Sequence, residues 1–191
     1  MIRARVSSDR SALEQVVADA FVEPVDGRVV NMMRALDQSG ASRADLVAID
    51  SDTVVGHVRL SRGWIDARDR LVPALILSPL AVAPDRQRYG IGTRLVAAAL
   101  EAADNEGAPA VFLEGSPEYY GARGFSKASD HGFDRPSRRI PDPAFQVAFG
   151  ASYEASMRGR VVYPEAFWLT DTVGLRDPYL SEVEKRIEDR Q

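Results

Sequence analysis

The sequence contains no cysteine among its 191 residues, which excludes disulfide bonds, thiolate metal ligands and a cysteine nucleophile. It contains two histidines, and no cluster of histidine and carboxylate residues has metal-ligand spacing, so we expect no metal site. No apolar run approaches the roughly 20 residues that span a bilayer. The first residues also lack the long apolar region of a signal peptide. These absences predict a soluble, cytoplasmic protein without a membrane partner.

The charge balance is mildly acidic. The chain has 28 acidic and 24 basic residues, which gives a formal net charge of −4. Proteins that bind nucleic acid usually carry a strongly basic surface, and the short basic patch at residues 135–139 does not supply one. We therefore expect no nucleic-acid partner. The length suits one domain, or one domain with an extension, and the 45% hydrophobic content allows a sizeable core.

The spacing of apolar residues predicts a mixed α/β fold. A three-residue turn at 50–52 joins two of the expected strands as a hairpin. The expected strands are 2–6, 45–49, 53–60, 74–82, 110–113, 145–149 and 160–163. The expected helices begin near residues 9, 29, 93, 118 and 179, the last being a charged helix at 179–190. The polar stretches 61–72 and 126–143 are expected to be loops.

The most informative segment follows the apolar strand that ends at Val82. Gln87-x-x-Gly90-x-Gly92 comes next, and an amphipathic helix begins at once. A strand, a glycine loop and a helix together turn backbone N–H groups into a cradle for phosphate. Glycines let a ligand approach the main chain closely, and the helix dipole points its positive end at the same place. This segment predicts an anionic ligand that contains a diphosphate.

A second segment reads Tyr119-Tyr120-Gly121-Ala122-Arg123-Gly124-Phe125. With the glycine loop, it resembles the GNAT acyltransferase superfamily, whose pyrophosphate loop is written Arg/Gln-x-x-Gly-x-Gly/Ala and is followed by an aromatic-Tyr-x-x-x-Gly-Phe segment. Residues 77–84 and 163–167 further resemble a bacterial subgroup of predicted N-acetyltransferases. The resemblance implies a mixed, mostly antiparallel sheet with a central splayed pair of parallel strands flanked by helices. It places the acyltransferase domain at 1–150 and an extension, with a late strand and a charged helix, at 151–191.

The resemblance also implies that acetyl-CoA is the acyl donor. In this family the pantetheine arm lies between two splayed parallel strands, which here would be 75–82 and 110–114. The backbone of one strand would pair with the arm, and the loop amides would hold the diphosphate. Arg86 is a further neighbour for the phosphate groups. The implied cofactor-binding residues are Leu80, Ala81, Val82, Gln87, Arg88, Tyr89, Gly90, Ile91, Gly92 and Thr93.

The catalytic residues are implied in part. Tyr120 matches the family's usual general acid, because a phenol near the sulfur can protonate the departing thiolate. The base stays open among Glu114, which ends the strand 110–113, His57 on the hairpin, and Glu118; we place Glu114 with Tyr120 in the catalytic set. Structural alternatives remain: Tyr120 as a core tyrosine, His57 as a satisfied strand histidine, and Glu114 as the cap of the next turn.

The function implied is transfer of an acetyl group from acetyl-CoA, by direct attack, to a primary amine of a small molecule or peptide. The alternatives are an acyl-CoA sensor without turnover, and a transferase for a different acyl group. Thr93-Arg94 stands after Gly92 in place of the lysine and Ser/Thr of a P-loop, which argues against a nucleotide-binding kinase or NTPase. Residues 150–191 could complete the sheet, shape the acceptor site or build a homodimer.

Overall fold

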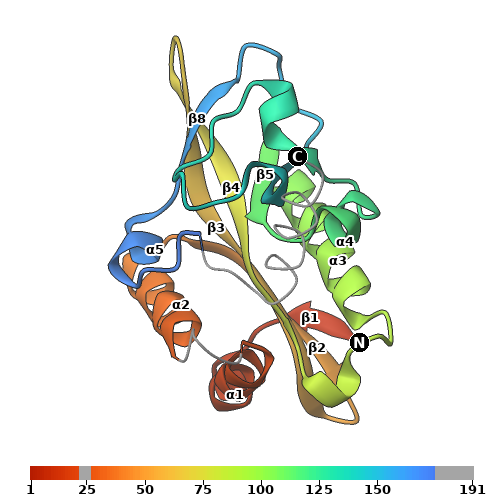
Figure 1. Ribbon diagram of the computed structural model, residues 1–191. Helices are drawn as coiled ribbons and strands as arrows, with labels where there is room; N and C mark the ends of the chain where they lie inside the picture. Colours follow the sequence, from red (N-terminus) through yellow and green to blue (C-terminus); the bar gives the residue numbers. More distant parts are fainter. Residues whose placement is uncertain (22–26, 175–191) are drawn as a thin grey trace, which may run out of the picture.

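The computed structural model describes residues 1–21 and 27–174, and within them eight strands form one sheet (Figure 1). The order is β1-β2-β3-β4-β5-β7-β6, and β8 pairs with β3 off this path. The strands are β1 (Ile2–Ala4), β2 (Ser42–Asp50), β3 (Thr53–Ala67), β4 (Leu71–Val82), β5 (Ala110–Glu114), β6 (Ser126–Lys127), β7 (Phe145–Phe149) and β8 (Gly159–Val162). The helices are α1 (Arg10–Ala20), α2 (Arg28–Ser39), α3 (Ile91–Asn105), α4 (Pro117–Gly121) and α5 (Glu165–Leu169).

One pair of neighbouring strands is parallel, and the other named pairs are antiparallel. β4 and β5 are in parallel register at Leu75 with Val111 and at Ile76 with Phe112. The helix α3 connects them, as a crossover between parallel strands requires. The predicted fold class, a mostly antiparallel mixed sheet with a central parallel pair and flanking helices, is confirmed.

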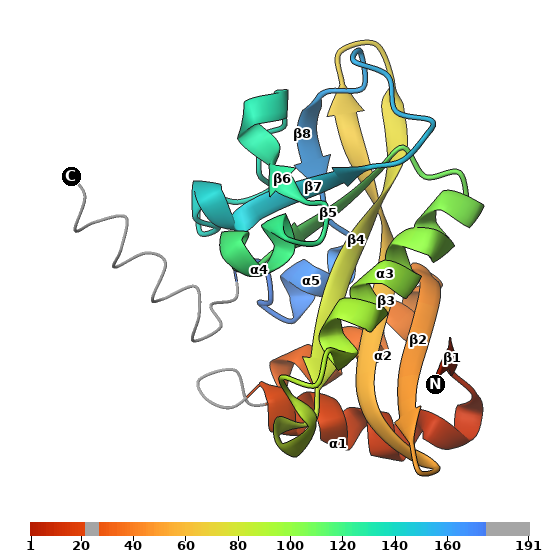
Figure 2. The ribbon, with the colours of Figure 1, turned by 90° about the vertical axis from the view of Figure 1, so that its right-hand side faces the viewer.

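Helices cover the two faces of the sheet unequally. α3 packs on β2, β3 and β4, and its apolar stripe joins one core cluster that includes Leu95, Val58 and Leu77. On the other face α1 packs on β3 and β4, and α2 packs against α5, as the two views show (Figures 1 and 2). The second core cluster lies there and includes Leu13 and Leu36. Side chains alternate along each strand, so neighbouring residues belong to different clusters.

The prediction of a loop over residues 61–72 is wrong. β3 continues to Ala67, and β4 begins at Leu71, so the hairpin is much longer than expected. The inward positions of this stretch include Ser61 and Gly63, which lack the apolar size that marks a strand in sequence. Close packing explains the glycine at position 63, because an added Cβ would lie 2.9 Å from the Ile76 side chain and 2.9 Å from the carbonyl oxygen of Val162.

The stretch 126–143 is more than the surface loop that was predicted. It contains β6 and short 3-10 turns at Ala128–His131 and at its end. Phe133 and Ile140 are buried within it, and the Phe133 ring makes an edge contact with Phe112 at 5.0 Å. The helix predicted at 179–190 lies outside the described residues.

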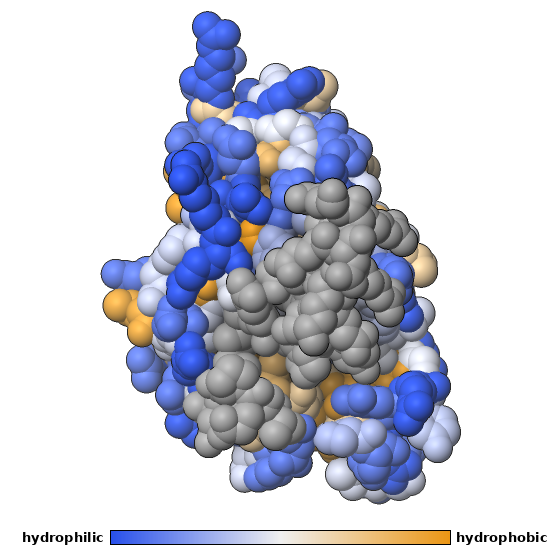
Figure 3. Space-filling view, in the orientation of Figure 1, coloured by the Kyte–Doolittle hydropathy of each residue, from blue (hydrophilic) through white to orange (hydrophobic). Residues whose placement is uncertain are grey.

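The outer surface is largely polar. In the space-filling view hydrophilic residues cover most of the described part of one face, with an apolar spot at the place of α5 (Figure 3). Exposed apolar side chains on α5 include Trp168 and Leu169. Among the described residues, no helix is long and apolar enough to cross a membrane.

Candidate active site

One edge of β4 is open toward β5. Its other edge stays paired with β3 through Val82. On the β5 side, parallel pairing involves Leu75 and Ile76, and within the described residues it does not continue beyond Ile76. Backbone N–H and C=O groups alternate between the two edges of a strand, and those of Ala81 face β3. The backbone groups of Leu80 therefore face the open side, where they have no strand partner. An extended ligand could add to β4 there as a further strand would.

A bulge changes the course of β4 just before this open edge. Val58 of β3 lies opposite Leu80, whereas Leu60 lies opposite Leu77. Two steps along β3 therefore match three steps along β4, and the extra residue falls in the Ser78–Pro79 segment. Bulges bend a strand and increase its twist. This one stands between the paired and the open part of β4.

The loop after β4 leads into the first turn of α3, where several backbone amides have no hydrogen-bond acceptor within the helix. Gly90 precedes the helix at φ 74°, a left-handed conformation that glycine adopts readily. The amide of Arg94 bonds back to the Gly90 carbonyl at 3.1 Å. By helix geometry the amides of Ile91, Gly92 and Thr93 have no acceptor within α3, and the helix dipole adds positive potential there. Such a terminus is suited to phosphate.

The remaining loop residues take different positions. Gln87 donates its side-chain amide to the carbonyl at the end of β4 at 3.2 Å, so its side chain closes the loop. Arg88 and Tyr89 are exposed, and Arg88 has a φ of 65°. Arg86 pairs with Asp50 at 3.0 Å, which directs its charge toward the turn between β2 and β3. The loop thus offers backbone groups and the charge of Arg88 to a ligand.

A cluster that the sequence interpretation missed lies against this first turn of α3. Arg123 donates to the Thr93 hydroxyl at 2.6 Å through its terminal nitrogen and at 3.2 Å through Nε. Its guanidinium lies 3.6 Å from the centre of the Tyr119 ring. The Tyr119 hydroxyl is so close to Gly92 that an added Cβ would overlap it. Arg123 lies in the turn that follows α4, four residues after Tyr119, and this spacing was the available signal.

Tyr120 lies beside the end of β5. Its ring packs on Gly115 so closely that an added Cβ would overlap the ring. Edge contacts with Tyr119 at 4.9 Å and with Phe125 at 5.7 Å orient the ring further. Gly115 is itself fixed, because its carbonyl accepts a hydrogen bond from buried Gln146 at 3.1 Å. The phenol therefore has a defined place on the α3 side of the sheet, in the core cluster there.

Glu114 is the last residue of β5 and lies on the opposite side. Its carboxylate Oε2 accepts the Gly174 amide at 2.9 Å. Burial raises the pKa of Glu114 to about 8, although the Gly174 amide, the Tyr163 hydroxyl and Arg139 act in the other direction. A carboxyl with this pKa exchanges its proton close to neutral pH. The end of β5 thus has a phenol on one side and a proton-exchanging carboxyl on the other.

The comparisons with known proteins agree with this geometry. The model of the acetyltransferase (GNAT) family matches residues 12–133. This chain belongs to the GNAT acetyltransferase family. It is similar to YjhQ of Escherichia coli K12, an uncharacterized N-acetyltransferase, with 31% identity over 130 residues, or 68% of this chain and 71% of YjhQ.

Two solved relatives of this GNAT acetyltransferase contain the cofactor. The YhbS structure from Escherichia coli, in complex with CoA, matches with a TM-score of 0.78 and 26% identity over 87% of this chain and 91% of YhbS. A GNAT acetyltransferase from Brucella melitensis, in complex with acetyl-CoA, matches with a TM-score of 0.70 and 29% identity over 87% and 97% of the two chains. The predicted enzyme class, an acyltransferase, is confirmed.

Within this GNAT acetyltransferase His57 belongs to an internal charge network. Its ring is fully buried, and Nε2 lies 2.5 Å from the Asp45 carboxylate. Arg59, also fully buried, pairs with Asp45 at 2.5 Å and with Asp37 of α2 at 2.9 Å. Burial lowers the pKa of His57, and Asp45 opposes this in part. These contacts favour a structural role for His57 over that of a base. The third candidate, Glu118, is exposed on α4.

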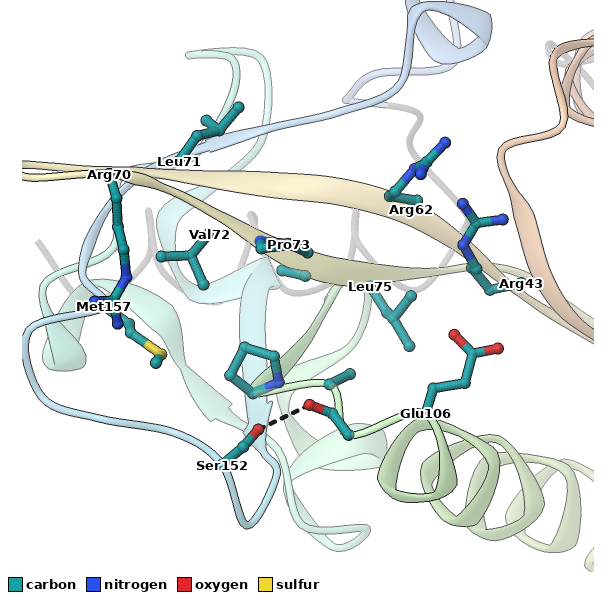
Figure 4. A pocket seen from close by; sticks show the side chains of 14 residues that line it. Arg43, Arg62, Arg70, Leu71, Val72, Pro73, Leu75, Glu106, Ser152 and Met157 are labelled. Carbon is teal, nitrogen blue, oxygen red and sulfur yellow. Dashed lines mark hydrogen bonds between the residues drawn. The ribbon is translucent and has the colours of Figure 1, made fainter.

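A cavity lies at the opposite end of the parallel pair (Figure 4). It has a volume of about 440 Å³ and is lined by the start of β4, the turn after α3 and residues of β2 and β3. Arg43, Arg62 and Glu106 are among the lining residues, and Arg43 lies across from Glu106. The lining includes Leu75, where β4 and β5 are still paired, so this cavity is separate from the open edge. In the described part of the chain, no group of three or more His, Asp or Glu residues could hold a metal ion.

Proposed function

We propose that this acyltransferase moves an acetyl group from acetyl-CoA to a primary amine by direct attack. One observation carries the proposal: the open edge of β4 runs toward the first turn of α3. At that turn, amides without a helix acceptor and the guanidinium of Arg123 can bind an anion. An extended arm that ends in a diphosphate fits this arrangement. The CoA complexes of the two solved relatives support the choice of ligand.

The described residues divide the binding work among them. The backbone of Leu80, Ala81 and Val82 pairs with the amides of the arm. The amides between Arg88 and Thr93 hold the diphosphate, helped by the helix dipole. Arg123 adds a fixed positive charge beside Thr93. Charge-assisted hydrogen bonds of this kind are about twice as strong as neutral ones.

Acetyl-CoA supplies the acetyl group as a thioester, and the protein moves the protons. Glu114 takes a proton from the acceptor ammonium, which makes the amine nucleophilic. A backbone amide on the open edge of β4 donates to the thioester carbonyl as charge develops on its oxygen. Tyr120 donates its phenolic proton to the departing sulfur. The two proton-transfer groups lie on opposite sides of the end of β5, which matches their opposite tasks.

The acceptor is a small molecule or a peptide with a free amine, and we place the catalytic domain at residues 1–150. The segment from 151 onward adds β8 to the edge of β3 and packs α5 against α2. It also contributes Gly174 to the surroundings of Glu114. We infer that this extension shapes the acceptor side of the site. We further infer a cytoplasmic location and no nucleic-acid or membrane partner; a homodimer built through the extension is an alternative role for that segment.

Native mass spectrometry of the purified protein tests the cofactor, and thiol release tests the reaction. We expect CoA or acetyl-CoA to co-purify, and free thiol to appear when acetyl-CoA meets a panel of primary amines. Tyr120→Phe should slow turnover about 100-fold, within the range for loss of a general acid, with CoA affinity unchanged. Tyr153→Phe removes a hydroxyl from a tyrosine packed on Phe149, away from this site, and is the control.

Three outcomes would contradict the proposal. CoA binding without turnover on any amine would favour a sensor. Faster transfer from a longer acyl-CoA than from acetyl-CoA would point to a different acyl group. Equal turnover by Tyr120→Phe and Tyr153→Phe would remove Tyr120 from the mechanism.

A further inference from the structure

The Glu114 carboxyl is surrounded by residues from the far C-terminal part of the described chain. Gly174 donates its amide to Oε2 at 2.9 Å, although sixty positions separate the two residues in sequence. Tyr163, just after β8, brings its hydroxyl into interaction with the same carboxyl. We propose that Gly174 and Tyr163 are positioning residues that orient the Glu114 carboxyl for proton transfer. This rests on the proposed role of Glu114 as the base.

Gly174 fits its place only as glycine. Its φ is 73°, in the left-handed region that other residues adopt at a cost. An added Cβ would lie 2.6 Å from the Arg139 Cβ and 3.1 Å from its carbonyl carbon. The backbone of Arg139 cannot yield as a flexible side chain would. A larger residue at 174 must therefore move the amide that points at Glu114.

Neighbouring contacts hold this amide in position. Val173 is almost fully buried, and the Thr172 hydroxyl donates to the Phe167 carbonyl at 3.2 Å. Asp171 pairs with Arg139 at 2.5 Å and with Arg28 of α2 at 3.1 Å. The segment is thus tied to α5, to α2 and to the stretch before β7. The Gly174 amide thus reaches Glu114 from a segment that is packed and paired on these sides.

Tyr163 is the second group. Its side chain is buried, and its ring lies 5.1 Å from that of Phe167. Within the described residues the hydroxyl makes no hydrogen bond of good geometry, and a buried hydroxyl without a partner is costly. The carboxyl of Glu114 is the acceptor it interacts with. Burial raises the pKa of Tyr163 well above its usual value, so the phenol keeps the proton that it can donate to the carboxyl.

The two donors have a predictable effect on the base. A hydrogen bond to a carboxylate favours its charged form, whereas burial disfavours it. The pKa of about 8 is the outcome of that opposition. Removing a donor leaves burial less opposed and raises the pKa further. A rise in the pKa of Glu114 therefore shows that a residue hydrogen-bonds to the base, whereas a residue that only supports the fold would leave this pKa unchanged.

Gly174→Ala is the decisive variant, and Gly107→Ala is its matched control. Gly107 has a similar φ of 68° but nothing within 4 Å of an added Cβ, so it imposes the backbone cost without touching Glu114. The pKa of Glu114 is read from carbon-13 carboxyl shifts in glutamate-labelled protein, assigned by the signal lost in Glu114→Gln. We expect Gly174→Ala to raise this pKa by about one, as loss of a hydrogen bond to a charged group implies. The pH at which acetyl transfer becomes half-maximal should rise equally.

Tyr163→Phe provides an independent measurement, including where Gly174→Ala does not fold. We expect Tyr163→Phe to fold and to raise the pKa of Glu114, as Gly174→Ala does. A pKa unchanged in Tyr163→Phe and in a folded Gly174→Ala would overturn the inference, because both groups would then only fill space. Failure of the wild type to transfer acetyl groups would instead overturn the proposed function, since the titration of Glu114 needs no acceptor.

Discussion

The ring of Tyr120 rests on the Cα atom of Gly115, the residue that follows Glu114. An added Cβ at Gly115 would overlap the ring, so the phenol approaches the end of β5 only because this position has no side chain. The carboxyl and the phenol are therefore both anchored at the same end of one strand. Their relative position therefore depends on the backbone at the end of β5.

Gly115→Ala should displace the phenol without removing it. A small misplacement of a catalytic group can cost about 100-fold in rate, so we expect kcat to fall by about 10- to 100-fold. The KM for acetyl-CoA should change little, because the loop and the open edge of β4 are untouched. Steady-state kinetics with acetyl-CoA and a responsive amine measure both quantities.

Gly121→Ala is the matched control for that variant. Gly121 lies on α4 as Tyr120 does, and nothing stands within 4 Å of an added Cβ. It should leave kcat unchanged. If Gly115→Ala also left kcat unchanged while the protein stayed folded, the position of Tyr120 would not matter to the reaction.

Arg123 should affect acetyl-CoA and acetyl-pantetheine differently. Its guanidinium is held beside Thr93 at the first turn of α3, where we place the diphosphate. Acetyl-pantetheine has no phosphate, so Arg123→Ala should raise the KM for acetyl-CoA about tenfold, equivalent to about 1.4 kcal/mol, and leave acetyl-pantetheine unaffected. Arg123→Lys should retain part of the affinity as a point charge.

A purely structural Arg123 would behave otherwise. It would fix α4 to α3 through Thr93 and Tyr119, and its loss would then weaken the reaction with both donors equally. Isothermal titration with CoA and with pantetheine separates the two cases even without an acceptor. Equal losses for both ligands would contradict the phosphate contact.

The sequence already indicated the glycine loop and Tyr120, the proposed acid, because these signals are local. Residues 87–92 follow an apolar strand directly, and Tyr120 lies within a short motif, so neither needed long-range information. The strand at 61–67 escaped notice because its inward positions include Ser61 and Gly63, whose burial depends on the packing of β4 and β8. Period-2 alternation is visible only where the buried positions are large and apolar.

The surroundings of Glu114 could not be predicted for a different reason. Gly174 contacts Glu114 from a segment with no strand or helix of its own, and no local pattern marks it. Its position follows from the burial of Val173 and from the ion pairs of Asp171 with two distant arginines. Such contacts are properties of the tertiary structure. Arg123, in contrast, could have been found, because it lies four residues after Tyr119 in the turn that closes α4, within the same short motif.

The rate of acetyl transfer should rise with pH up to about 8. A base works in its deprotonated form, and burial raises the pKa of Glu114 to about 8. Below that pH, kcat/KM should fall about tenfold per pH unit, with a plateau above it. Glu114→Gln should remove this dependence along with most of the activity. A flat profile in the wild type between pH 6 and 9 would contradict the assignment of Glu114.

The same raised pKa makes the stability of the fold depend on pH. The pKa of Glu114 is higher in the folded protein than the usual value near 4.5, so the folded state binds this proton more tightly. The contribution to the free energy of unfolding is present below the usual value and is lost as pH rises through about 8. The glutamine side chain of Glu114→Gln cannot lose a proton, so the variant does not share this loss of stability. The Tm of the variant minus the Tm of the wild type should therefore be larger at pH 9 than at pH 5, by a few degrees for each kcal/mol that the wild type loses. Differential scanning calorimetry at both pH values checks this, and an unchanged difference would contradict it.

Arg59 should be the most stability-sensitive charged residue described here. Its guanidinium is fully buried and contacts Asp45 at 2.5 Å, Asp37 at 2.9 Å and the Met33 carbonyl at 2.8 Å. Arg59→Met removes the buried cation and leaves two partly exposed carboxylates that Arg5 still contacts, so the cost should be near the lower end of the range of about 3–5 kcal/mol for breaking a buried pair. At about 2–4 °C per kcal/mol, the Tm should fall by about 10 °C.

Arg70→Met is the control that separates the effect of burying an arginine from the effect of losing an ion pair. Arg70 pairs with Glu154 at 3.3 Å, and both side chains are exposed, so its loss should change stability by less than about 0.5 kcal/mol. Thermal unfolding of both variants at pH 7 measures the contrast. A drop for Arg59→Met no larger than for Arg70→Met would mean that water reaches the Asp45 and Asp37 carboxylates. In that case His57, which shares Asp45, would be open to water as well and would return as a candidate for proton transfer.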